Sequence, residues 1–202
     1  MVEGGQQGAV AASHLSALAL QPVLQSADSK LKENDGCALA ISDDEYFLGD
    51  PMDVAAVYPE YKVNLGKIGG SLNEVKNAAL LGATCELPPN FPVKRGAIYD
   101  GPDGTTGNLV GYGIVCVGIP IGDPAFVRRF LELKKESVFE KNCRTVELVQ
   151  SNSHTAFQLL RTCLNPMVDF LGRGMDASAN TLPFFMQFDA KIMDCCETFR
   201  PR

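Results

Sequence analysis

Residues 37–49 read Cys37-Ala38-Leu39-Ala40-Ile41-Ser42-Asp43-Asp44-Glu45-Tyr46-Phe47-Leu48-Gly49, and this stretch decides the fold. An apolar run leads into adjacent acids, and a second apolar run leads out of them. Strands bury aliphatic and aromatic side chains, whereas a core rejects charged ones. The pattern therefore predicts a β-hairpin, with strands at Cys37–Ile41 and 46–48 and an acidic turn between them.

The adjacent acids Asp43 and Asp44 permit two interpretations. Two carboxylates at a tight turn can hold a divalent cation, because Mg²⁺ prefers charged oxygen ligands. Asp is also a common turn residue, so a merely polar turn is the alternative. The pair by itself does not decide between a metal site and a turn.

Periodicity predicts helices on both sides of the hairpin. Residues 9–26 have apolar side chains at helical spacing, and Pro22 predicts a kink or an end near Gln21. A polar turn is expected at 30–36, and a second helix at 53–58 that Pro59 ends early. We expect a short strand around Val63 and Leu65, and a weak helix at 72–81.

The second half of the chain changes character. Residues 86–111 hold four prolines and five glycines, which predicts a long loop with one short strand at Ala97–Tyr99. Residues 114–117 and 119–121 are apolar and β-branched around Gly118, which indicates a second hairpin. Asp123 and Pro124 suit a helix start, and further helices are expected at 126–141, 151–171 with a bend at Pro166, and 182–199. The class is α+β, with one region at 1–122 and an all-helical region at 123–202.

Composition excludes several classes of protein. No apolar stretch approaches the ~20 residues of a membrane span, and no basic-then-apolar signal peptide opens the chain, so we expect an intracellular protein, cytoplasmic or nuclear. The seven cysteines are an odd number without a Cys-x-x-Cys motif, and neither His14 nor His154 pairs with them, which disfavours zinc and disulfides. Residues 1–123 carry seven basic and fifteen acidic side chains, whereas 124–202 carry eleven and nine. A tight, autonomous nucleic-acid binder would be more basic.

Four segments, taken in order, resemble the second half of a reverse transcriptase of the non-LTR retrotransposon type. Gln7-Gly8 is similar to the Gln-Gly motif of that family, and Ser42-Asp43-Asp44 to its catalytic turn. Asn64-x-x-Lys67 resembles the motif that follows, and 117–122, around Gly118, resembles the hairpin that grips the primer. The likeness covers about 4–175.

The resemblance implies a partial polymerase palm, made of a helix and an antiparallel acidic hairpin, followed by a thumb-like helical bundle. It implies nucleotidyl transfer from deoxynucleotides to a DNA primer on an RNA template, with Mg²⁺, or Mn²⁺ in its place, held by Asp43 and Asp44. Lys67 would lie near the leaving phosphates; the alternative is a solvated lysine. Gln7, Gly8, Asn64 and Gly118 would contact template, nucleotide or primer; the alternative for the first two is a flexible terminus.

Several positions depart from the family pattern. The family's first catalytic Asp and its fingers precede the Gln-Gly motif, and this sequence starts three residues before Gly4. Gln6, Ile41 and Ser16 replace an Arg, an aromatic residue and a Phe of the pattern, and Ala9-Val10 replaces a small or acidic residue and Pro. We therefore expect a polymerase fragment that is inactive alone. The alternatives are a non-enzymatic module that binds nucleic acid or protein, and an unrelated α+β protein with a structural cation.

Overall fold

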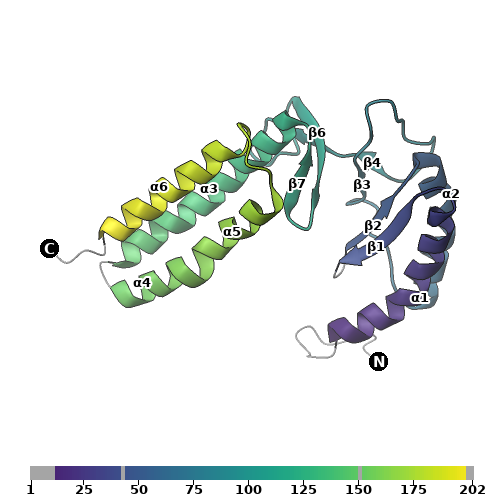
Figure 1. Ribbon diagram of the computed structural model, residues 1–202, viewed down its shortest axis with the longest axis horizontal. Helices are drawn as coiled ribbons and strands as arrows, with labels where there is room; N and C mark the ends of the chain where they lie inside the picture. Colours follow the sequence, from purple (N-terminus) through teal and green to yellow (C-terminus); the bar gives the residue numbers. More distant parts are fainter. Residues whose placement is uncertain (1–11, 42–43, 150–151, 199–202) are drawn as a thin grey trace. The chain divides into compact units, whose positions relative to one another are not determined.

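The chain forms two compact units, 1–94 and 95–202, in a computed structural model that describes residues 12–41, 44–149 and 152–198 (Figure 1). Both helices and small antiparallel sheets occur, so the predicted mixed helix-and-strand class is confirmed. The sequence predicted a boundary between two regions at 122/123, whereas the boundary between the compact units follows Lys94. The difference arises because the strands before 122 pack on the helix that follows them.

The N-terminal unit places two helices against the predicted hairpin. Its main elements are α1 (Ala12–Lys32), β1 (Cys37–Ile41), β2 (Asp44–Leu48) and α2 (Pro51–Lys67). Its core consists of the inward side chains of α1 and α2 with Ala38 of β1, and Phe47 of β2 packs against it. The buried members from the helices are Val23, Ala27, Leu31, Val57, Tyr61 and Leu65.

Both helices are longer than predicted, because they continue through their prolines. Pro22 lies inside α1 and Pro59 inside α2, and both rings are exposed. A proline removes one helical hydrogen bond, but water can satisfy the freed carbonyl at an exposed position, and burial of the opposite face stabilises the turns on each side. The turn predicted at 30–36 therefore shrinks to 33–35, where Asp35 takes a φ of 59°.

Two further predictions in this unit were wrong. Val63 and Leu65 lie in α2 and not in a strand, and Leu65 is a core residue. The expected helix at 72–81 is absent from the described structure, where this segment is a turn followed by β3 (Ala78–Ala79). β3 pairs with β4 (Lys94–Arg95).

The C-terminal unit joins a three-stranded sheet to a helical bundle. The sheet has the order β5 (Ala97–Tyr99), β6 (Leu109–Cys116) and β7 (Ile119–Gly122), as the predicted short strand and second hairpin require. Helix α3 (Pro124–Val149) begins at the predicted Pro124 and packs on the sheet and on α6 (Leu182–Thr198) (Figure 1). Its buried residues, with those of the other helices, form the second core.

The remaining bundle segment is one nearly continuous run of helix. It comprises α4 (Ser153–Leu159), a π-helical stretch at Leu160–Leu164, and α5 (Asn165–Gly174). Pro166 lies in the first turn of α5, where a missing N–H costs little, so the predicted bend at Pro166 becomes a π-helical stretch just before it. None of the described helices is long and apolar enough to cross a membrane.

Candidate functional site: the acidic hairpin

The hairpin that carries the acids is a regular antiparallel pair. Cys37 lies opposite Leu48 and Ile41 opposite Asp44, with the intervening residues in register. Ala38 and Phe47 face the helices, and the ring of Phe47 meets the ring of Tyr61 edge-on, with centroids 4.9 Å apart. The hairpin is therefore held against α2 along its inner face.

A second contact ties the hairpin to α1. The backbone N–H of Ala38 donates to Asp28 Oδ1 at 3.0 Å, and Lys32 Nζ lies 2.6 Å from Asp28 Oδ2. Both donors lower the pKa of Asp28, with Lys32 the larger cause. Asp28 thus satisfies one outward backbone group of β1, which would otherwise be a free sheet edge.

Asp44 opens β2 and is exposed, whereas Asp43 lies outside the described residues. The hydroxyl of Tyr46, two residues along, donates to Asp44 Oδ2 at 3.4 Å. Side chains two apart share a strand face, so Asp44 and Tyr46 lie on the face that turns away from α2. Asp44 is thus free to present its other carboxylate oxygen to solvent or to a cation.

Glu45 points to the opposite face, toward α2. Burial raises the pKa of the Tyr61 hydroxyl, and the nearby Glu45 carboxylate raises it further. Tyr61 belongs to the second half of α2, so the acidic end of the hairpin lies beside that half. The last turns of α2 are consequently at the same end of the N-terminal unit as Asp44.

Those last turns carry two of the predicted site residues. Lys67 Nζ donates to Asn64 Oδ1 at 2.8 Å, one helical turn away. Lys67 is exposed and ends the helix, where a cation interacts favourably with the helix dipole. The strand predicted near these residues is a helix, and only the helix brings Asn64 and Lys67 onto one face.

The other predicted residues do not join this cluster. Gln7 and Gly8 lie outside the described residues. Gly118 belongs to the C-terminal unit, where it forms with Val117 the turn between β6 and β7. Gly118 has a φ of 79°, and a Cβ there would lie 3.5 Å from the ring of Phe170.

Val117 carries strain that the sequence did not reveal. Its φ of 50° is a left-handed conformation that a β-branched residue rarely adopts. A two-residue hairpin turn of type I′ needs positive φ at both positions, which Asn-Gly supplies without strain. The apolar, β-branched neighbours of Gly118 were a signal for the hairpin, but they gave none for this strain.

No group of three or more His, Cys, Asp or Glu side chains that could hold a metal ion occurs within 12–41, 44–149 and 152–198. Comparison of the chain with protein-family models, with curated proteins and with solved structures finds no match.

Proposed function

We propose that the N-terminal unit is part of the palm of an RNA-directed DNA polymerase and that the C-terminal helices are thumb-like. The observation that carries the proposal is Asp44, next to Asp43 in sequence, at the start of β2 in a regular hairpin that packs against α1 and α2. The order of elements supports it: a helix, an acidic hairpin, a second helix, a second hairpin and a helical bundle.

In this proposal, Asp43 and Asp44 hold Mg²⁺, or Mn²⁺ in its place. Two ions in a polymerase stabilise the attacking primer oxygen and the leaving pyrophosphate in an in-line displacement. Lys67 would offset charge on the leaving phosphates of the deoxynucleotide, and Asn64 orients its ammonium group. Gln7 and Gly8 would contact template and nucleotide, and Gly118 the primer.

Asp43 and the described residues supply only half of such a site. Two adjacent carboxylates on one hairpin cannot enclose two ions without an acid from another strand, and the described residues offer no further acidic cluster. A Mg²⁺ held by one or two carboxylates keeps most of its water. We therefore expect weak cation binding, on the order of 1 mM, and no primer extension by this chain alone.

The metal proposal is tested by titrating Mn²⁺ and following the free ion by electron paramagnetic resonance. The variant Asp43→Asn with Asp44→Asn should abolish binding at the hairpin. The matched control is Glu33→Gln with Asp35→Asn, which removes two charges from the same unit at exposed positions; Asn at position 35 tolerates the positive φ there. Equal Mn²⁺ binding by the double variant and the control would refute the site.

Catalysis needs a separate measurement. The chain is incubated with RNA template, DNA primer, deoxynucleotides and Mg²⁺ or Mn²⁺, with the double variant as the background. We expect no extension above that background. Extension by the chain that the double variant lacks would show that the site is complete and would contradict the half-site reasoning.

A second candidate function is a non-enzymatic interaction module, and one observation favours it. Leu15 and Leu18 of α1 are each 63% exposed, ahead of the buried part of that helix. Apolar side chains at i and i+3 share a helix face, and an exposed apolar stripe marks an interaction surface. Loss of self-association or partner binding in Leu15→Ser with Leu18→Ser, with Mn²⁺ binding unchanged, would support this function.

A further inference from the structure

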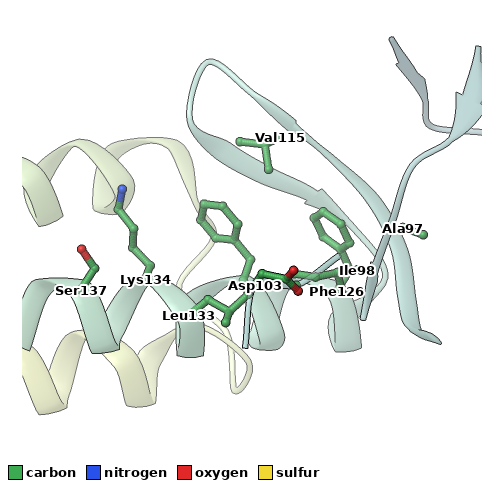
Figure 2. Close-up of a pocket in the computed structure, with 10 residues that line it drawn as sticks. Ala97, Ile98, Asp103, Val115, Phe126, Leu133, Lys134 and Ser137 are labelled. Carbon is green, nitrogen blue, oxygen red and sulfur yellow. The ribbon is translucent and has the colours of Figure 1, made fainter. Parts of the chain in front are cut away.

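The C-terminal unit contains a cleft of about 370 Å³ between its sheet and α3 (Figure 2). Side chains from β5, β6, the 100–108 loop and α3 surround it. Those from the strands and the loop are Ala97, Ile98, Asp103, Gly104 and Val115, and those from α3 are Phe126, Phe130, Leu133, Lys134 and Ser137. All of them belong to one compact unit.

The walls of the cleft are mainly apolar and are held in place. Two Phe rings come from α3, at Phe126 and Phe130, and aliphatic side chains come from the strands opposite. Gly104 forms part of the floor with a φ of 68°, and a Cβ there would approach Leu133 to 2.7 Å. The positive φ favours glycine at this position, and a larger residue would also require the Leu133 side chain to shift.

Arg129 of α3 holds the 100–108 loop in place. Its guanidinium donates to the backbone carbonyls of Tyr99, Asp100 and Gly101, at 3.3, 2.8 and 2.6 Å. Asp103 stabilises the same loop internally, because its carboxylate accepts hydrogen bonds from the backbone N–H and the hydroxyl of both Thr105 and Thr106. Hydrogen bonds from Arg129 and Asp103 thus hold the loop side of this open cleft in place.

Lys134 is a polar group of the cleft that has no partner among the described residues. It is half-buried on α3, and no described side chain pairs with its ammonium group. Its neighbour Lys135, by contrast, donates to Gln187 Oε1 at 3.1 Å. Figure 2 shows Lys134 and Ser137 extending from α3 on the side of the strand that carries Val115.

We propose that this cleft binds a small amphiphilic carboxylate, with its anionic group at Lys134 and its apolar body against the two Phe rings. Ligand pockets are typically apolar cavities of this size with a few convergent polar groups. A half-buried cation favours an anion, and the hydroxyl of Ser137, one turn further along α3, can donate to the same group. The cleft has room for about twelve groups of the size of a water molecule, at ~30 Å³ each.

The inference concerns the C-terminal unit alone and does not depend on the metal site. Its test is an NMR titration of the full chain with phenylbutyrate, which has one carboxylate, one ring and a size that fits the cleft. Phenylbutanol is the uncharged probe and phenylbutylamine the cationic one. We expect a dissociation constant on the order of 1 mM for phenylbutyrate, with amide shifts at Ile98, Gly104 and Lys134.

Three variants make the test specific. Lys134→Ala should weaken phenylbutyrate binding about tenfold, because a charge-assisted contact is lost, and should leave phenylbutanol unchanged. Lys141→Ala is the matched control, since it removes the same charge seven residues along α3, outside the cleft, and should change nothing. Val115→Phe should fill the cleft and abolish the shifts, because Val115 is on the face of the sheet that lines the cleft (Figure 2), and the amide spectrum reports whether each variant folds.

We expect affinity to fall from phenylbutyrate to phenylbutanol to phenylbutylamine, and we expect the amide shifts to be confined to the cleft. The proposal is overturned if Lys134→Ala and Lys141→Ala bind phenylbutyrate equally. It is also overturned if the shifts centre on exposed apolar residues elsewhere, such as Leu15 and Leu18, or if saturating probe produces none.

Discussion

Replacement of Arg129 by Ala should release the 100–108 loop, although Arg129 is remote from this loop in sequence. Its largely buried guanidinium binds three backbone carbonyls at the start of that loop. Each hydrogen bond to a charged group contributes ~1.5–3 kcal/mol, but the three share one side chain, whose ordering costs ~2 kcal/mol, and water reaches part of the loop. We expect a loss of local stability of about 2–4 kcal/mol.

Hydrogen exchange measures this loss at single amides and does not require two-state unfolding of the whole chain. The reporters are the N–H groups of Tyr99, Asp100 and Gly101, which bond to the carbonyls of Gly104, Asn108 and Thr106. A loss of ~2–4 kcal/mol corresponds to exchange that is faster by a factor of about thirty or more.

Arg128→Ala is the matched control, because Arg128 is the adjacent arginine and bonds only to Asn180 Oδ1 among the described residues. It should accelerate exchange at the loop amides by less than about threefold, as expected for an exposed polar contact. Similar exchange in the two variants would refute the reasoning that the three carbonyl contacts hold the loop.

Three other substitutions test single features of the fold. Leu31→Ala, at a position only 1% exposed, should destabilise the N-terminal unit by ~3–5 kcal/mol in urea unfolding followed by tyrosine fluorescence, to which Tyr46, Tyr58 and Tyr61 of this unit contribute. Val117→Asn should stabilise the β6–β7 hairpin by ~1 kcal/mol, read from thermal unfolding, because Asn adopts the positive φ that strains Val; destabilisation would show that Val117 packing outweighs the strain. The Thr105 and Thr106 donors lower the pKa of Asp103 to about 2. Its contribution to the stability of the loop is therefore complete above about pH 4 and is lost as pH falls toward 2. Asp103→Asn should remove this part of the acid dependence of hydrogen exchange in the loop.

The hairpins were predictable because their signals are local. Apolar runs on each side of Asp43-Asp44 and of Gly118 predict a strand, a turn and a strand, and the described parts of both hairpins appear in the structure. The Pro124 helix start was predictable for the same reason, since capping is decided within one turn.

The failures involve burial that the local sequence does not display. Pro22 and Pro59 predict helix ends, but Leu31 and Leu65, a few turns further on, bury against the core and extend both helices. The segment 72–81 shows a weak helical pattern but follows two glycines and lacks a buried stripe, so nothing in the described packing stabilises a helix there. Propensity is a weak prior, and tertiary packing decides these cases.

The candidate site divides in the same way. Asp44 and the hairpin were identified from sequence order, whereas Asn64 and Lys67 came together only because a helix replaced the expected strand. The cleft was not predictable at all, because it depends on the contact between Arg129 and a loop about thirty residues earlier in the chain. The prolines and glycines of 86–111 indicated a loop, but they did not indicate that hydrogen bonds hold it in one conformation.

The distribution of charge limits how this chain could hold nucleic acid. Most basic side chains of the described C-terminal helices already have partners in the same unit, such as Arg144 with Glu140 and Arg173 with Asp169. Lys134, Lys141 and Arg161 have none there, and three phosphate contacts would give a salt dependence with a slope of only about −3 for a duplex. The acids of the N-terminal unit, which we propose hold a cation, would repel phosphates until that cation is bound. The polymerase proposal therefore requires that divalent ions strengthen binding of primer and template, and that Asp43→Asn with Asp44→Asn removes this effect while the shallow salt dependence of the helices persists.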